Sequence, residues 1–263
     1  MRANLNAPKS KIVAVVLGGG GKDVLAQHAQ VSAKALVPLH GKPMGAYVLE
    51  ALNESKVDKT VYVGPLTGLE PTLNGAVTVP AGQRMTDSLA LGLGAALTQK
   101  PASILVVTAD IPWISGASLD NFIDTAPQVD LVYPAIPQSA TEAQFAGQKR
   151  TYAKVKEGSF TGGNLILITP AAVPSLLSFM DRLYAGRKNP FALAAVFGWD
   201  VVLKLLTGRA EIAQLETRAS KLLGVEARAF ITEDASLGAD IDKPEHLAFF
   251  VSEGERGRGG EGE

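Results

Sequence analysis

A short apolar strand that runs directly into four glycines is the feature that most constrains how this chain folds. Residues 11–17 read KIVAVVL, a β-branched run typical of a strand buried on both faces. Gly18 to Gly21 follow at once, and α/β sheets bind ligands where such strands end. Glycines let backbone N–H groups approach an anion closely, and their entropic cost favours a binding role over a plain turn.

Short apolar strands alternate with helical patterns along most of the chain. This alternation predicts a three-layer α/β fold with a Rossmann-like, mostly parallel sheet and helices on both faces. The polar stretch 138–148 is expected to be a loop, followed by an extended piece at 151–155. Further strands are expected at 60–63, 76–79, 104–108, 131–133, 165–168 and 227–231, and helices at 43–52, 86–97, 115–124, 170–183, 191–206, 210–223 and 244–251.

A single domain over residues 11–253 accounts for this pattern. Its helices at 172–224 are predicted to be a C-terminal helical insertion packed at one side of the sheet. Residues 1–10 are polar and expected to be flexible, and residues 254–263 contain only glycine and charged residues, which predicts a disordered tail. The apolar run 191–206 contains Asp200 and Lys204 and is too short to span a membrane, so we expect a buried helix there.

Composition excludes several classes of function. The formal net charge is −1, so the chain carries no electrostatic footprint for nucleic acid or an anionic membrane. It has no cysteine, which excludes disulfides, thiolate metal sites and cysteine nucleophiles, and only three scattered histidines. A bound metal is therefore expected to be a hard cation on carboxylates. The N-terminus lacks a signal-peptide pattern, so we expect a cytoplasmic protein.

Two common phosphate-binding motifs do not fit the glycine run. A P-loop that ends at Gly21-Lys22 would need glycine at Val16 and a hydroxyl residue at Asp23. A dinucleotide fingerprint that starts at Gly18 or Gly19 would need a third glycine at Asp23 or Val24. The phosphate-binding turn must therefore be of another kind.

A second segment, KALVPLHGKP at 34–43, follows the glycine run after a short gap. Together the two resemble the N-terminal signature of the MobA-like NTP transferases, which are named for the molybdenum-cofactor guanylyltransferase and have the glycosyltransferase A-type fold. The resemblance implies a nucleotide-diphospho-sugar transferase type of sheet, loop amides around a triphosphate, and Lys34 as a catalytic residue that neutralises phosphate charge. Lys22-Asp23 departs from the arginine or serine of many members. The nucleotide-binding residues implied are Leu17, Gly18, Gly19, Gly20, Gly21, Lys22 and Lys34.

Three further segments match the family. The loop 80–89 implies a nucleobase pocket with Gly82 and Ser88, although in isolation a strand-to-helix turn with a cap explains it better. Asp110 follows the strand 104–108 and matches the metal aspartate of the family, which makes it a catalytic Mg²⁺ ligand. Asp240 and Asp242 match its closing motif, and alternate residues of an extended segment share a face. Either one is the second metal ligand, unless Asp242 only caps the next helix.

The resemblance implies a nucleotidyltransferase that moves a nucleoside monophosphate from an NTP to a small, anionic acceptor and releases pyrophosphate. Gly163 and Asn164 are its acceptor-side candidates, and Arg150, Lys154 and Lys156 could grip an anion. GTP and CTP are the favoured donors. Molybdopterin, a sugar phosphate, a cobinamide, an isoprenoid precursor and phospholactate remain open as acceptors, and so does the oligomeric state. The alternatives are a glycosyltransferase with a nucleotide-sugar donor and a non-catalytic nucleotide-binding protein.

Overall fold

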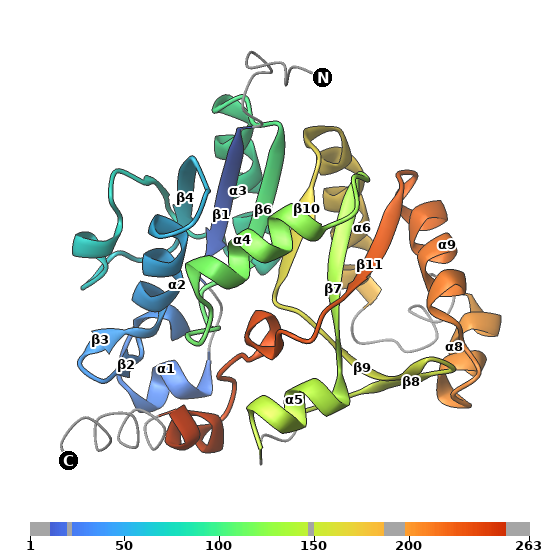
Figure 1. Ribbon diagram of the computed structural model, residues 1–263. Helices are drawn as coiled ribbons and strands as arrows, with labels where there is room; N and C mark the ends of the chain where they lie inside the picture. The colour runs from blue at the N-terminus through green and yellow to red at the C-terminus, as the bar shows by residue number, and fades with distance from the viewer. Residues whose placement is uncertain (1–10, 20–22, 147–149, 187–197, 251–263) are drawn as a thin grey trace, which may run out of the picture.

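The computed structural model describes residues 11–19, 23–146, 150–186 and 198–250, and these form a three-layer α/β fold (Figure 1). The predicted flexible N-terminus and the tail at 254–263 lie outside the described residues. In the described part, nine strands make one sheet in the order β5-β4-β1-β6-β10-β7-β9-β8, with β11 on the other edge of β7. The strands are β1 (Ile12–Leu17), β4 (Lys59–Val63), β5 (Val77–Val79), β6 (Ser103–Thr108), β7 (Leu131–Pro137), β8 (Ala153–Val155), β9 (Gly158–Gly162), β10 (Leu165–Ile168) and β11 (Ala227–Ile231).

The sheet is mostly parallel, as predicted. Strand β1 pairs in parallel with β4 and β6, β4 with β5, and β7 with β11. Strands β10 and β9 run against the others, because β10 pairs antiparallel with β6 and β7, and β9 with β7 and β8. The carboxyl ends of β1, β4 and β6 therefore meet at one edge of the sheet, where ligands bind in folds of this kind.

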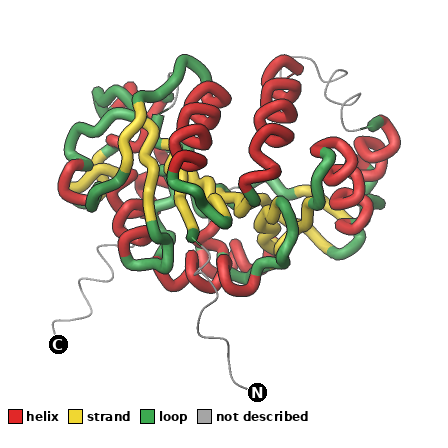
Figure 2. The backbone as a smooth tube through the Cα atoms, turned by 90° about the horizontal axis from the view of Figure 1, so that it is seen from above, coloured by secondary structure: helices red, strands yellow, loops and turns green. Residues whose placement is uncertain are grey.

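Helices cover both faces of the sheet, because side chains of a strand point alternately to the two sides (Figure 2). In β1, Ala14 and Val16 pack toward α2 and α4, whereas Val13 and Val15 pack toward α3, α6 and α9. All four are fully buried. These helices are α2 (Met44–Asn53), α3 (Met85–Thr98), α4 (Gly116–Thr125), α6 (Val173–Gly186) and α9 (Ile212–Leu223).

Smaller elements complete the described fold. A last helix covers residues 244–250, close to the predicted 244–251. The others are α1 (Val24–His28), the 3-10 helices η1 (Lys34–Leu36), η2 (Glu70–Thr72), η3 (Pro170–Ala172) and η4 (Ala235–Gly238), the hairpin of β2 (Pro38–Leu39) and β3 (Lys42–Pro43), α5 (Gln138–Gln144) and α8 (Trp199–Leu206).

Two predictions about local structure were wrong. The polar stretch expected to be a loop begins with α5, because burial of Ala140 and Thr141 against the sheet stabilises a short helix whose other side is solvated. The apolar run expected to be a buried helix continues as α8, in which Val201 is buried but Leu203 and Leu206 are exposed. Its first part, 191–197, lies outside the described residues. Whether the helices at 172–224 are an insertion stays a prediction.

No helix among the described residues is both long and apolar enough to cross a bilayer.

Close packing of α3 on the sheet gives a prediction about stability. A Cβ at Gly92 would lie 2.6 Å from Val15 Cγ1 and 2.8 Å from Val63 Cγ2, whereas a Cβ at Gly94 meets nothing within 4 Å. We expect Gly92→Ala to lower the free energy of unfolding by about 1–3 kcal/mol through overpacking. Gly94→Ala, in the same helix, should raise it by about 0.5–1 kcal/mol. Urea unfolding of both variants checks this pair, and equal effects of the two substitutions would contradict the described packing.

Candidate active site

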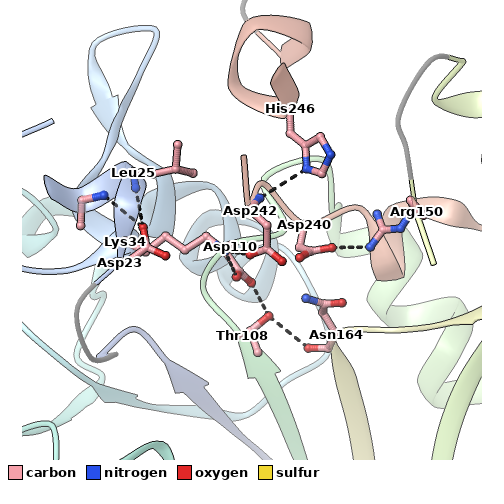
Figure 3. Close-up of polar contacts among 11 residues, drawn as sticks. Asp23, Leu25, Lys34, Thr108, Asp110, Arg150, Asn164, Asp240, Asp242 and His246 are labelled. Atoms are coloured by element: carbon pink, nitrogen blue, oxygen red, sulfur yellow. Dashed lines mark hydrogen bonds and ion pairs between the residues drawn. The ribbon is translucent and has the colours of Figure 1, made fainter. Parts of the chain in front are cut away.

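Three carboxylates meet just beyond the carboxyl end of β6 (Figure 3). Asp110 follows that strand, and Asp240 and Asp242 follow η4. Each offers an oxygen, and the three oxygens lie within 4.8 Å of one another. The backbone N–H of Ile241 donates to the carbonyl oxygen of Asp110 at 3.0 Å, which fixes the extended segment against β6. The side chain of Ile241 is fully buried, so its two neighbours turn to the opposite side and share one face, as their spacing predicts.

Both oxygens of the Asp110 carboxylate have a partner. The hydroxyl of Thr108 donates to Oδ1 at 2.5 Å, and the ammonium of Lys34 donates to Oδ2 at 2.6 Å. Lys34 also pairs with Asp242, so it joins two of the three carboxylates. Burial alone would lower the pKa of Lys34, but the charges of Asp110 and Asp242 outweigh it and hold the pKa above its ordinary value. Lys34 is therefore a permanent positive charge at this site.

Arg150 holds the third carboxylate. Its guanidinium pairs with Asp240, and the two side chains are 9% and 14% exposed. Burial, reinforced by the neighbouring Asp242, raises the pKa of Asp240 despite Arg150. Burial acts in the same sense on Asp242, but its hydrogen bonds with Asp240 and Lys34 lower the pKa below its ordinary range. The cluster thus places two basic side chains around three acidic ones.

The glycine turn after β1 is held tightly against the neighbouring strands. The backbone N–H groups of Gly18 and Gly19 both donate to the carbonyl oxygen of Val63 at 2.9 Å. A Cβ at Gly18 would overlap the Tyr62 ring, and one at Gly19 would overlap Ala81. These two glycines are required by close packing, and their amides are engaged with the sheet.

The remainder of the turn leads into α1. Gly20, Gly21 and Lys22 lie outside the described residues. Asp23 caps the helix, since its Oδ1 accepts from the N–H groups of Leu25 at 2.9 Å and Ala26 at 3.1 Å. Its charge is therefore directed at the amides of α1, directly after the glycine turn. The nucleotide-binding roles of Leu17, the glycines and Lys22 stay predictions.

Gly82 and Ser88 lie together before and within α3. The hydroxyl of Ser88 accepts from the N–H of Gly82 at 3.0 Å, and Ser88 is almost fully buried. A Cβ at Gly82 would overlap Asp87. Both residues thus shape the turn between β5 and α3, and the nucleobase contact predicted for them stays a prediction.

Gly163 and Asn164 connect β9 to β10 beside the carboxylates. The backbone of Asn164 donates to Leu237 at 2.8 Å and accepts from the N–H of Thr108 at 3.0 Å, so it links β6 to η4. Its side chain points toward Asp240 in Figure 3. A Cβ at Gly163 would lie 2.9 Å from Pro134. The preceding Gly162 is the last residue of β9.

Some members of the site were not predicted in their observed roles. Thr108 orients Asp110, and His246 accepts from the N–H of Asp242 at 3.4 Å through Nδ1. In the sequence, Thr108 stands two residues before Asp110 and His246 four residues after Asp242, and these spacings are the signals that could have indicated their roles. Arg150, a candidate for gripping an anionic acceptor, pairs with Asp240, 90 residues away, and no local pattern indicates that contact. Lys156 pairs with Glu211.

The donor set suits a hard divalent cation. Carboxylate oxygens are the ligands that Mg²⁺ prefers, and oxygens in one octahedral Mg²⁺ shell lie at most about 4.2 Å apart. The three carboxylate oxygens, within 4.8 Å of one another, nearly match that size before any adjustment. The residues present therefore fit a magnesium site.

A mostly parallel α/β sheet with a glycine turn and a carboxylate cluster at its carboxyl edge is the architecture of α/β proteins that bind ligands beyond the carboxyl ends of their strands. The chain belongs to the MobA-like NTP transferase family, since the model of that domain matches residues 14–194. That match extends through α6, beyond the first stretch of resemblance seen in the sequence, which ends near residue 170. The protein is an NTP-dependent nucleotidyltransferase.

Three solved structures are similar to this chain over at least 90% of its length. A hypothetical transferase from Thermus thermophilus is 43% identical, with a TM-score of 0.82 over 90% of this chain and 99% of its own. A 2-C-methyl-D-erythritol 4-phosphate cytidylyltransferase, also from Thermus thermophilus, is 16% identical, with a TM-score of 0.53 over 92% and 98%. A CMP:2-keto-3-deoxy-manno-octonic acid synthetase in complex with CTP is 15% identical, with a TM-score of 0.56 over 94% and 100%. The latter two share the fold. No protein of curated function matches this sequence.

Proposed function

We propose that this enzyme transfers a nucleoside monophosphate from GTP or CTP to a small anionic acceptor, with Mg²⁺ as its cofactor and pyrophosphate as the second product. The observation that carries the proposal is the cluster of Asp110, Asp240 and Asp242 with Lys34. An acceptor oxygen attacks the α-phosphorus, and the bond to the β-phosphate oxygen breaks. Such transfer depends on positioning and charge neutralisation more than on a protein nucleophile.

The carboxylates of Asp110, Asp240 and Asp242 would hold Mg²⁺. When bound, the ion supplies positive charge against the phosphate oxygens and the leaving pyrophosphate. Thr108 and Arg150 orient two of the carboxylates through the contacts described above. Because neighbours of metal ligands set their orientation, these two residues belong to the site as positioning residues.

Lys34 has a charge that remains in every protonation state of the cluster near neutral pH. Its four-carbon side chain is flexible, so the ammonium can leave one of its carboxylate partners and bind a phosphate oxygen nearby. We infer that Lys34 neutralises triphosphate charge when an NTP is bound, and that the turn from Gly18 to Lys22 lies against the phosphates. An acceptor that is already a phosphate needs no strong general base, so no such residue is assigned.

The choice of nucleobase in the NTP donor is supported by resemblance alone. The likeness to molybdenum-cofactor guanylyltransferase favours GTP, and the CTP complex of a protein with the same fold favours CTP. Gly82 and Ser88 are the proposed neighbours of the base. We expect neither nucleic acid nor membrane as a partner, because the charge is balanced, and we expect a cytoplasmic enzyme.

Calorimetry against ATP, GTP, CTP and UTP, each with and without Mg²⁺, tests the proposed function. We expect micromolar binding of GTP or CTP that depends on Mg²⁺ and weaker binding of the other nucleotides. Binding of a nucleotide sugar with no binding of free NTPs would favour the glycosyltransferase alternative. If an NTP binds equally well with and without Mg²⁺, a non-catalytic nucleotide-binding protein would be favoured.

A further inference from the structure

An apolar cavity of about 270 Å³ lies between α9 and the strands β7, β8, β9 and β11. Figure 1 shows α9 beside β11 at the end of the sheet that carries β8 and β9. Apolar side chains from both sides form most of its wall, among them Val155, Phe160, Ile212, Leu215 and Ala219. A cavity of about 150 Å³ holds one benzene-sized ring, so this one has room for a bicyclic group.

The charged side chains among the described residues of the wall are already paired. Glu216 accepts from the backbone N–H of Ala229 at 2.9 Å, and Arg228 pairs with Glu226 at 2.6 Å. Neither is therefore free to bind a polar ligand without losing its own partner. A sugar or a phosphate placed inside would leave its polar groups without hydrogen bonds, which is costly. The cavity thus suits an apolar group.

Tyr133 joins the cavity to the carboxylate cluster. Its ring forms part of the wall, and its hydroxyl lies over Gly162, where a Cβ would overlap it. Burial raises the pKa of Tyr133, and the charges of Arg150 and Asp240 also act on it, so the hydroxyl lies near that ion pair. Gly162 precedes Asn164 by two residues, and the Asn164 side chain faces the cluster in Figure 3. Tyr133 and Gly162, which line the cavity, therefore lie between it and the carboxylate cluster.

The position of the cavity also fits the direction of the reaction. The glycine turn follows β1 and the proposed base neighbours follow β5, on one side of β6 in the sheet order. The carboxylates lie near the carboxyl end of β6, and the cavity lies on the far side, beyond β10. In phosphoryl transfer the attacking and leaving oxygens are roughly in line, so acceptor and pyrophosphate occupy opposite sides of the reacting phosphorus.

We propose that this cavity receives the apolar body of the acceptor, whose phosphate lies at the carboxylates. The acceptor is then a phosphate monoester of an aryl or alicyclic group and not of a free sugar. A phosphate oxygen of the monoester attacks the α-phosphorus of the NTP, the bond to the β-phosphate oxygen breaks, and pyrophosphate leaves. The product is a nucleoside diphosphate ester that carries the apolar group. This inference rests on the proposed function and names its substrate class.

Binding of 1-anilinonaphthalene-8-sulfonate, an apolar bicyclic anion, tests the cavity first. We expect one bound dye per chain, with the dissociation constant raised at least tenfold by Ala219→Phe, which fills the cavity. Leu215→Trp is the second filling variant. Ala213→Phe is the matched control, because Ala213 is exposed on α9 and does not line the cavity, and it should change the constant less than twofold. Far-ultraviolet circular dichroism and thermal unfolding verify that each variant is folded.

Pyrophosphate release with the Mg²⁺–NTP that binds tests the acceptor class. We expect 1-naphthyl phosphate to have a KM at least tenfold below that of ribose 5-phosphate, and Ala219→Phe to remove the difference while NTP binding is unchanged. A preference for ribose 5-phosphate, a preference that survives both filling variants, or no reaction of either phosphate would overturn the inference. Failure of the dye to bind would also overturn it, because the apolar walls would then be covered by the chain itself. Loss of Mg²⁺-dependent NTP binding in the unmodified protein contradicts the proposed function instead.

Discussion

Asp110→Asn is expected to lower the rate of nucleotidyl transfer by about 10²–10³, the usual cost of removing one electrostatic group from a transition state. Asp110 contacts both Thr108 and Lys34 and lies within 4.8 Å of the other two carboxylates, so the substitution removes a charge from the centre of the site. The Mg²⁺-dependent part of NTP binding should weaken at least tenfold. Calorimetry and pyrophosphate release measure the two effects.

Asp124→Asn is the matched control for this experiment. Asp124, which lies on α4, has an exposed carboxylate that pairs with Lys56 outside the cluster. Its substitution should leave turnover within twofold and stability within about 1 kcal/mol, because exposed ion pairs contribute little. Circular dichroism should show both variants folded. Unchanged turnover in Asp110→Asn would show that this residue has only a structural role, at a helix entry or turn, and that it does not hold a metal ion.

Arg150→Leu is expected to have the largest effect on stability, with a loss of about 3–5 kcal/mol in the free energy of unfolding. Its guanidinium is only 9% exposed and pairs with Asp240, which is 14% exposed. Removing Arg150 leaves the Asp240 carboxyl without its partner in a largely buried place, where it must take up a proton or remain an uncompensated charge. Urea unfolding of the variant at neutral pH measures the loss.

A double variant separates the ion pair from mere packing. In Arg150→Leu combined with Asp240→Leu, no unpaired charge remains, so more than half of the lost stability should return. Lys56→Ala breaks the exposed pair with Asp124 and should cost less than about 1 kcal/mol. A double variant as unstable as Arg150→Leu alone would show that Arg150 stabilises the fold by packing and not by holding Asp240.

The strands that define the fold could be predicted from the sequence because they are buried on both faces. The strands predicted at 11–17 and 104–108 differ by one residue at most from the observed β1 (Ile12–Leu17) and β6 (Ser103–Thr108). The place of β10 could not be predicted, since its run Leu165–Ile168 carries no signal that it lies antiparallel between β6 and β7. Which distant strands pair with each other depends on tertiary packing, and local periodicity carries no information about it.

The sequence predicted the residues of the site that belong to recognisable motifs, but not the contacts among them. Asp110, Asp240 and Asp242 come from segments that resemble a family pattern, and the structure brings them together. The contact of Lys34 with two of these carboxylates and the pairing of Arg150 with Asp240 join residues 76 to 208 positions apart. Such contacts depend on how η1, β6 and η4 meet in space, which no spacing in the sequence reveals.

The fate of the three phosphorus atoms of the nucleotide tests the central claim most directly. The protein, Mg²⁺ and the NTP that binds would be incubated with a deproteinised small-molecule extract of source cells, in parallel reactions labelled at the α- or the γ-phosphate. We predict that the α-label enters one new small molecule while the γ-label appears as pyrophosphate in equal amount, with neither product formed by Asp110→Asn. Release of the γ-label as orthophosphate with a nucleoside diphosphate left behind would contradict nucleotidyl transfer.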